Sequence, residues 1–550
     1  MNERRNVKPI IGLVAVCALA VALGIWVGTS LERSKEEEKP KNPVLESATQ
    51  KFEDVLKYVE RDYVDETNLS TLSESAICNL LCALDPHSAY LTAREVEPSN
   101  VDLKGELVGI GIEFFMWHNA VYVIAPISGG AAEQAGIKVG DRITKIDDKD
   151  LIGQGWKQID VMKQLRGAQG TKVRLAVKRS NEAKLLDFIV TRDKLPYTSV
   201  DVSYMLDDQV GYIKVGRFTT NTVTEFKTAL NHLQKQGMAK LLLDFRGNTG
   251  GNMDTAIKFA NDLLDQGQLI AYTKGKVSKY TTKYYAKGSD KFDRCPLIVL
   301  VDEGTASAAE VVAGALQDND RALIVGRSTF GRGLIQVPIQ LSDNAQLRLT
   351  VARYYTPSGR VIQKPYGEIV EGYHAGLMAR YKQGDYLHVD NIEFDDVLKY
   401  QTSKGRIVYG GGGIIPDYFI PVDALSHDAY HDQLQAKNVL QQYALEYVDQ
   451  YRKTLTTMKY EKYYGDFEVS DLMLKKLISQ ASKLGLSDDH QVLHVAEDRI
   501  RLLLKAFIAR NIWGAQGFYP IYHQKDGDLQ KSLQLFGEAE ALLQSTTIDE

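Results

Sequence analysis

The stretch between residues 211 and 363 constrains the fold more than any other part of the chain. Apolar runs such as "GYIKV", "KLLLDF", "CPLIVLVD" and "RALIVG" alternate there with helical patterns such as "TVTEFKTALNHLQKQG", "MDTAIKFANDLL" and "SAAEVVAGALQ". Runs that are apolar at nearly every position suit strands buried on both faces, as in parallel sheets connected by helices. The alternation therefore predicts an α/β core with a largely parallel sheet.

The chain has 550 residues, which is too many for one core, and its texture changes several times along its length. Helical spacing of apolar residues predicts an N-terminal helical segment at residues 47–104. Short β-rich runs separated by glycine turns predict a compact domain at residues 105–180, inserted before the core. We expect the core to span residues 181–420. Amphipathic stripes predict an all-helical domain at residues 421–550, which could join copies of the chain in a homo-oligomer.

The N-terminus has the pattern of a membrane anchor. Three basic residues precede an uncharged apolar run from Ile10 to Val27, and a charged linker follows at residues 31–46. About 18 apolar residues are just enough to span a membrane, and positive charge before them keeps that end in the cytoplasm. We expect residues 1–30 to be a cytoplasmic stub and anchor, with the bulk of the chain on the outer, periplasmic side of the cell membrane. A cleaved signal peptide is the competing interpretation.

Charge and cysteine content argue against two other classes of protein. The net charge of −5 offers no basic surface, so we expect no nucleic-acid partner. Four cysteines are too few for a disulfide scaffold in a chain of this size.

Two strand ends carry residues that could do chemistry. The run ending at Val301 is followed by "DEGTASAAE", so Ser307 stands where a helix begins and free backbone N–H groups point outward. Such groups can stabilise an oxyanion, although Ser307 taken alone would serve equally as an ordinary N-cap. The run "LLLDF" is followed by "RGNTGGN", a glycine-rich turn that lets backbone amides approach a ligand.

The motifs "LLLDFRGNTGG", "GTASAAE" and "TFGRGLIQ", in this order and spacing, make the chain resemble the C-terminal processing peptidases, also called tail-specific proteases. "LDPHSAYL", "YYTPSGRVIQ" and "GGGIIPD" extend the resemblance over residues 47–420. It implies a ClpP/crotonase-like core in which Ser307 is the nucleophile of a Ser-Lys pair. It also implies a base at position 332, oriented by Gln336, and an oxyanion hole formed by the amides of Ala308, Gly250 and Gly251.

By the same resemblance, residues 105–180 look like a PDZ domain. "LVGIGIEF" matches its carboxylate-binding loop and first peptide-binding strand, which would be formed by Gly109, Ile110, Gly111 and Ile112. Amides in such a loop can hold a terminal carboxylate while the peptide adds as a strand to the sheet edge. The implied partners are proteins or peptides with exposed C-termini, and no metal or organic cofactor is implied.

Position 332 departs from the family pattern, because arginine stands where the general base should be lysine. A lysine can act as a base when burial lowers its pKa from about 10.4 toward 7, whereas a guanidinium stays protonated. Arg332 therefore cannot take the proton of Ser307. Glu310, one helical turn after Ser307, could be the base, although a nearby guanidinium would lower its pKa. His87 in "LDPHSAYL" is a further candidate, with a structural role as its alternative.

Three interpretations of position 332 stay open at this point. Another group acts as the base while Arg332 stabilises charge, or catalysis has been lost, or arginine is a tolerated variant. We predict a membrane-anchored serine endopeptidase that captures C-terminal tails through its PDZ domain and cleaves them. The alternative is a catalytically impaired peptide-binding scaffold.

Overall fold

The computed structural model describes residues 42–96, 99, 108–117, 120–127, 129–152, 154–179, 182–195, 198–288, 295–366, 396–422, 429–486 and 490–544. The predicted membrane segment Ile10–Val27 lies outside these residues. Across the described ranges, no helix is both long and apolar enough to cross a membrane. The chain divides into two compact units, Met1–Ile77 and Cys78–Glu550.

The described part of the first unit is helical, as its apolar spacing predicts. Helix α2, Pro43–Asp62, has a proline in its first turn and is capped by Asn42, whose side chain accepts a hydrogen bond from Val44 N at 3.1 Å. None of its side chains is buried, and apolar residues such as Phe52 and Val55 are exposed. Helix α3, Leu69–Cys82, begins in the same unit.

The second unit contains the predicted α/β core. Its main sheet has the strand order β10-β11-β12-β15-β16-β21, in which β10 is antiparallel to β11 and the other neighbours are parallel. The strands are β10 (Val200–Met205), β11 (Val210–Val215), β12 (Lys240–Asp244), β15 (Leu297–Val301), β16 (Leu323–Gly326) and β21 (Tyr418–Phe419). The helices between them are α7 (Thr222–Lys235), α8 (Met253–Asn261) and α9 (Ala308–Asp318). The predicted parallel character of the sheet is confirmed.

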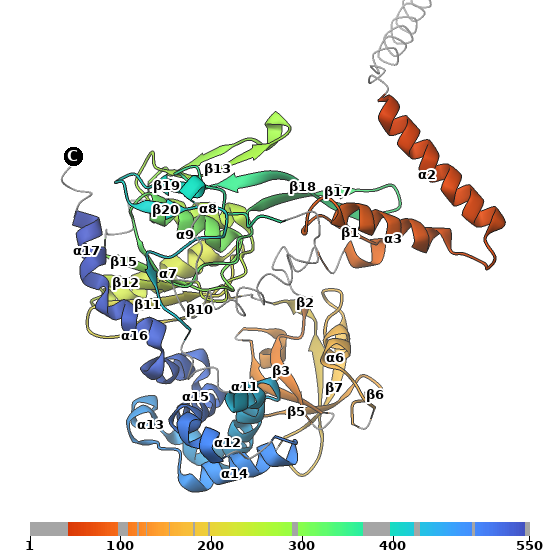
Figure 1. The fold of residues 1–550 in the computed structure, drawn as a ribbon. Coiled ribbons are helices and arrows are strands. Elements are labelled where there is room, and N and C mark those ends of the chain that lie inside the picture. Colours follow the sequence, from red (N-terminus) through yellow and green to blue (C-terminus); the bar gives the residue numbers. More distant parts are fainter. Residues whose placement is uncertain are drawn as a thin grey trace, which may run out of the picture. The chain divides into compact units, whose positions relative to one another are not determined.

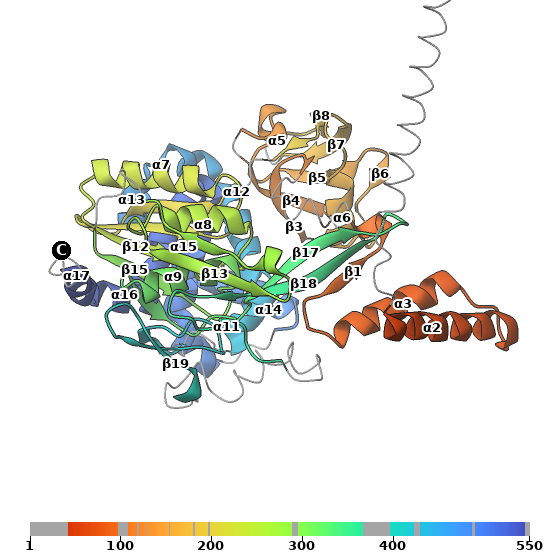
Figure 2. The ribbon, with the colours of Figure 1, turned by 90° about the horizontal axis from the view of Figure 1, so that it is seen from above.

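Strand β15 explains why these runs are apolar at nearly every position. Every residue of β15 is buried. Leu297 and Val299 pack in one apolar cluster with the helices α7, α8 and α9, which Figure 2 shows together. Ile298 and Leu300 belong to a second cluster on the opposite face. Because successive side chains point to opposite faces, a sheet covered on both sides needs an apolar residue at each position.

The opposite face is covered by the end of the C-terminal helical region. That region consists of α11 (Ala429–Ala436), α12 (Val439–Thr457), α13 (Tyr460–Asp466), α14 (Asp471–Lys483), α15 (His490–Tyr522), α16 (Gly527–Gln534) and α17 (Phe536–Gln544). Most of it has an apolar core of its own. Leu529 of α16 and Phe536 of α17 instead pack with Leu242 and Ile298 of the sheet, and Figure 1 shows both helices beside β15. The region is helical as predicted, but its last two helices are a layer of the α/β core.

A second sheet carries the segment that follows Arg332. It contains β1 (Ala89–Leu91), β13 (Leu269–Gly275), β14 (Lys283–Tyr285), β17 (Leu334–Gln340) and β18 (Gln346–Tyr355), in which β17 and β18 form the long hairpin of Figure 2. Strand β1 comes from "LDPHSAYL", which the sequence places in the helical segment 47–104. Its antiparallel pairing with β18 makes the end of that segment part of the core. A small hairpin joins β19 (Lys399–Gln401) and β20 (Ile407–Tyr409).

The inserted domain is β-rich, as predicted. Its sheet has the order β3-β4-β5-β7-β8 with β6 paired to β5, and β2 pairs with β9. Its elements are β2 (Val108–Gly109), β3 (Ile112–Trp117), β4 (Ala120–Pro126), α5 (Ala131–Gln134), β5 (Arg142–Ile146), β6 (Lys149–Asp150), α6 (Gln158–Leu165), β7 (Lys172–Lys178), β8 (Leu186–Thr191) and β9 (Asp193–Lys194). Because β8 pairs with β7, the domain continues beyond the expected boundary at residue 180.

Candidate active site

The turn between β15 and α9 presents Ser307 in a strained backbone conformation. Ser307 has φ 57° and ψ −115°, a region that residues with a side chain rarely adopt. It is the N-cap of α9 and is half-buried. Asp302 fixes the turn by accepting hydrogen bonds from Gly304 N and Thr305 Oγ1, each at 3.0 Å. Strain of this kind costs about 1–3 kcal/mol and is found most often at functional sites.

The glycine turn after β12 lies directly against Ser307. Gly250 has φ +96°, and a Cβ atom there would lie 2.8 Å from Ser307 Cβ and 2.9 Å from Ala308 N. Gly251 has φ +132°, and a Cβ atom there would lie 2.1 Å from Phe218 O. Both positions therefore need glycine, for the backbone conformation and for the lack of space.

The backbone amides around Ser307 differ in whether they already have a partner. Gly250 N donates to Asn248 Oδ1 at 2.9 Å, so it is already occupied in this structure. Its expected role as a donor of the oxyanion hole stays a prediction, and it would require this hydrogen bond to be shared or broken. Among the described residues, the amides of Ala308 and Gly251 have no hydrogen-bond partner. Ala308 and Gly251 are thus the candidate donors whose amides are free to bind an oxyanion in the described structure, and Gly250 has no side chain to fill the space beside them.

Glu310 is fully buried beneath this turn, and its carboxylate accepts four hydrogen bonds. Oε1 accepts from Thr329 Oγ1 at 2.5 Å and Gly331 N at 2.7 Å. Oε2 accepts from Ser307 N at 2.7 Å and Arg332 N at 2.9 Å. Burial raises the pKa of Glu310 and the hydrogen bonds oppose that rise, so the net direction is opposite to the lowering expected from a guanidinium. The carboxylate joins the backbone of Ser307 to that of Arg332, which suits positioning better than proton abstraction.

The loop that carries Arg332 has a glycine on each side, and neither has room for a side chain. A Cβ atom at Gly331 would lie 2.9 Å from Lys364 Cβ, and one at Gly333 would lie 2.8 Å from Gln363 N. The Arg332 side chain is half-buried. Within the part of the chain that the structure describes, its guanidinium forms no ion pair or hydrogen bond. The backbone of this loop is therefore fixed, while no contact among the described residues holds its guanidinium in place.

Gln336 has a different partner from the one that the resemblance implies. Its Nε2 donates to the carbonyl oxygen of His87. The same "LDPHS" segment is fastened by Asp85, whose Oδ1 accepts from His87 N at 2.8 Å and from Thr350 Oγ1 of β18 at 3.1 Å. Gln336 thus connects this segment to the hairpin that follows Arg332, and the described contact gives it a structural role.

The candidate carboxylate-binding loop of the inserted domain is a tight turn. Gly111 has φ +78°, and Gly109 ends β2. The carbonyl oxygens of Ile110 and Gly111 accept from Ala132 N at 2.8 Å and from Ile127 N at 2.9 Å. The Ile110 side chain lies in the domain core, and Ile112 packs against that core at the start of β3. Any contact of Ile110 with a terminal carboxylate would therefore come from its backbone.

Sequence reasoning missed the polar side chains that hold these turns together, among them Asn248, Asp302 and Thr329. Each one stands in a turn or loop after a core strand. Polar residues directly after buried strands are the only signal that could have pointed to them, and that signal does not say which backbone group each one binds.

An α/β core with a strained serine at a helix N-terminus, in a chain that also has a PDZ-like domain, is the arrangement expected of serine peptidases that carry a peptide-binding module. The model of peptidase family S41 matches residues 209–370, and that of the PDZ domain matches residues 108–190. A carboxy-terminal-processing protease of Bartonella bacilliformis is 38% identical over 317 residues, which are 57% of this chain and 72% of that protein. The chain belongs to peptidase family S41 and is a C-terminal processing serine protease homologue with a PDZ domain.

Two further relatives and one unassigned region complete the comparison. A probable CtpA-like serine protease of Staphylococcus haemolyticus is 29% identical over 428 residues, covering 78% of this chain and 80% of that protein. The solved structure of a photosystem II D1 C-terminal processing protease has 28% sequence identity and a TM-score of 0.37, covering 68% of this chain and 87% of that chain. Residues 430–514 match a family of unknown function.

Proposed function

We propose that the protein is a membrane-anchored serine endopeptidase that captures exposed C-terminal tails of protein substrates with its PDZ domain and cleaves them through Ser307. The observation that carries the proposal is the strained backbone of Ser307 beside the amides of Ala308 and Gly251, which have no hydrogen-bond partner in the described part of the chain. A serine that served only as an N-cap would have the extended backbone that N-caps normally adopt. The strained conformation of Ser307 would then lower stability with no functional benefit.

Each neighbour of Ser307 has a separate part in the proposed reaction. The hydroxyl oxygen of Ser307 attacks the scissile carbonyl, and the amides of Ala308 and Gly251 donate to the oxyanion that forms. Gly250 keeps this space empty because it lacks a side chain. Glu310 holds the backbone of Ser307 and of Arg332 at a fixed separation.

Arg332 acts in this proposal by its charge. A guanidinium cannot accept the proton of Ser307, but it can stabilise the alkoxide of the serine and the oxyanion of the intermediate. Glu310 already accepts four hydrogen bonds, so hydroxide from solvent removes the proton of the half-buried Ser307 and becomes water. The tetrahedral intermediate then breaks its C–N bond, the departing amine takes a proton from water, and a further water molecule hydrolyses the acyl-enzyme and frees Ser307. This path is slower than transfer to a neutral lysine, and it predicts a peptidase of low turnover.

The PDZ domain and the segment Ile10–Val27 set where the enzyme works. Binding of a substrate tail to the loop at Gly109–Ile112 raises the effective concentration of that chain at Ser307. An uncleaved anchor would keep the peptidase at the outer face of the cell membrane, where its substrates would be membrane-associated or secreted proteins. The helices of the C-terminal region could hold copies of the chain together.

The test is cleavage of an unfolded protein with an apolar C-terminus by the outward-facing part of the chain. Wild type, Ser307→Ala and Arg332→Lys are compared, and covalent labelling by a fluorophosphonate probe is measured in parallel. We expect wild type to cleave slowly and to be labelled, Ser307→Ala to do neither, and Arg332→Lys to cleave faster. Equal cleavage by wild type and Ser307→Ala would refute the proposal.

The second candidate is a peptide-binding scaffold, which the permanent charge of Arg332 favours. Its outcome in the same experiment is distinct: wild type is inert, while the PDZ domain still binds peptides with a free C-terminus. Cleavage by Arg332→Lys alone would then identify Arg332 as the residue that abolished catalysis.

A further inference from the structure

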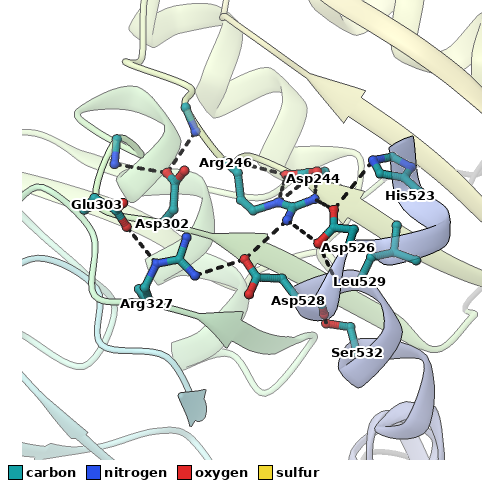
Figure 3. A network of polar contacts seen from close by, with 12 residues as sticks. Asp244, Arg246, Asp302, Glu303, Arg327, His523, Asp526, Asp528, Leu529 and Ser532 are labelled. Carbon is teal, nitrogen blue, oxygen red and sulfur yellow. Dashed lines mark hydrogen bonds and ion pairs between the residues drawn. The ribbon is translucent and has the colours of Figure 1, made fainter. Parts of the chain in front are cut away.

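Two aspartates of the C-terminal region, Asp526 and Asp528, bind arginines next to the loops that surround Ser307. Asp526 caps α16, and Asp528 lies in its first turn. Both bind arginines at the carboxyl ends of core strands, Arg246 after β12 and Arg327 after β16, as Figure 3 shows. Because β12, β15 and β16 are parallel neighbours, this is the edge of the sheet from which the nucleophile turn also starts.

Arg246 immediately precedes the glycine turn, and carboxylates bind its guanidinium on two sides. Nη1 and Nη2 donate to the two carboxylate oxygens of Asp526 at 3.0 and 2.8 Å, which is a bidentate pair. Nη2 also donates to Asp244 at 2.8 Å. The Arg246 and Asp526 side chains are only 14% and 5% exposed, so solvent screens the pair little.

Asp528 connects the remaining two loops. Its Oδ2 accepts from Arg327 Nη1 at 3.0 Å and from Arg246 Nη1 at 3.3 Å. Nε of Arg327 donates to Glu303 Oε2 at 2.8 Å, and Glu303 belongs to the nucleophile turn. Arg327 itself begins the loop that leads to Arg332. Asp528 therefore binds Arg246, which precedes the glycine turn, and Arg327, which begins the loop that leads to Arg332. Through Arg327 and Glu303 it is also connected to the nucleophile turn.

Two hydrogen bonds connect the segment that follows Arg246 to the turn that contains Ser307. Gly247 N, next to Arg246, donates to Asp302 Oδ1 at 2.8 Å. Ala306 N, next to Ser307, donates to Asn248 O at 2.8 Å. A displacement of the backbone at residue 246 would thus move the residues on both sides of the candidate oxyanion hole.

Each of the two arginines has a carboxylate partner besides these aspartates. The fully buried Asp244 also pairs with Arg246, and Glu303 pairs with Arg327. The capping of α16 by Asp526 needs only an acceptor oxygen, which asparagine also has. Burial would raise the pKa of Asp526, but the charge and hydrogen bonds of Arg246 outweigh it and lower the pKa. The carboxylate of Asp526 therefore stays ionised at neutral pH and maintains its ion pair with Arg246.

We propose that Asp526 and Asp528 are positioning residues for Ser307 and its oxyanion-hole amides, so that the C-terminal region completes the peptidase site. The proposal rests on the proposed role of Ser307 as the nucleophile. Misplacement of reacting groups by about 1 Å can cost about 100-fold in rate, so a small shift of the three loops is enough to matter.

The experiment compares Asp526→Asn and Asp528→Asn with wild type, using the outward-facing part of the chain with its C-terminal region intact. We expect both variants to label Ser307 with a fluorophosphonate about 10- to 100-fold more slowly, with kcat lowered by a similar factor and KM nearly unchanged. Hydrogen exchange of the amides at residues 244–252 should become faster. Asp528→Glu, which keeps the charge, should recover most of the labelling rate.

Asp320→Asn is the matched control. Asp320 is buried, accepts from Arg406 Nε at 2.6 Å, and follows the end of α9 opposite to Ser307. This variant should lower the melting temperature at least as much as the other two, with labelling of Ser307 close to wild type. If the three variants lose labelling only in proportion to their melting temperatures, the positioning role is wrong.

Failure of this inference can be told from failure of the proposed function. If wild type itself is not labelled at Ser307, the peptidase function fails, and hydrogen exchange alone then tests the attachment of the turn. Exchange at residues 244–252 that does not change in Asp526→Asn and Asp528→Asn would overturn the inference, whether or not the protein is a peptidase.

Discussion

Substitution of Gly250 by alanine tests whether the glycine turn really borders the nucleophile. The new Cβ atom would lie 2.8 Å from Ser307 Cβ and 2.9 Å from Ala306 O and Ala308 N. An ordinary contact between carbon atoms is about 3.5 Å, so Ser307 or the turn must move by about 0.7 Å. A left-handed backbone costs a residue with a side chain about 1–2 kcal/mol in addition.

The expected result is a loss of reactivity much larger than the loss of stability. A shift of that size next to the oxyanion-hole amides should slow fluorophosphonate labelling of Ser307 about 100-fold, comparable with deletion of one oxyanion donor. The free energy of unfolding, measured in urea, should fall by about 1–3 kcal/mol. Labelling rates are compared at a temperature where every variant is folded.

Gly247→Ala is the matched control within the same turn. Gly247 has φ +71°, so alanine there bears similar backbone strain, but its Cβ atom would have nothing within 4 Å. This variant should lose similar stability and keep most of its reactivity. Equal labelling rates for Gly250→Ala and Gly247→Ala would refute the reasoning, because they would show that contact with Ser307 is unimportant.

Three further outcomes concern the ionisable side chains of Glu310, His523 and Arg332. Glu310→Gln places an amide N–H against backbone N–H donors, so the free energy of unfolding in urea should fall by about 1–3 kcal/mol per unpaired group. Fluorophosphonate labelling of Ser307 should also disappear. An unchanged free energy of unfolding would contradict this prediction. Burial lowers the pKa of His523 from 6.5 to about 4. The unfolded chain therefore binds a proton first as the pH falls, and between pH 6.5 and 4 the free energy of unfolding should drop by about 3 kcal/mol more in wild type than in His523→Gln. For wild type, kcat/KM should keep rising toward alkaline pH, whereas Arg332→Lys should reach a plateau; matching profiles would exclude a change of base.

The candidate site was predictable where it depended on local pattern. A serine at the start of a helix, after a buried strand, and a pair of glycines after the neighbouring strand can both be recognised in the sequence. The sequence does not show which backbone amide already has a hydrogen-bond partner. Gly250 N donates to Asn248 Oδ1, and this bond depends on the rotamer of the Asn248 side chain. The same holds for Glu310, whose four donors come from two separate segments of the chain, the turn at Ser307 and the loop at residues 329–332.

The parallel α/β core, the β-rich domain and the helical character of the C-terminal region could all be predicted from the sequence, because each follows from the period at which apolar residues recur. The sequence did not predict that α16 and α17 cover the second face of the main sheet, with Leu529 and Phe536 against Leu242. An apolar stripe predicts that a helix packs against another apolar surface, but it does not identify that surface. The choice of partner, and with it the contact of Asp526 and Asp528 with Arg246, depends on shape and charge between residues 280 and 282 positions apart.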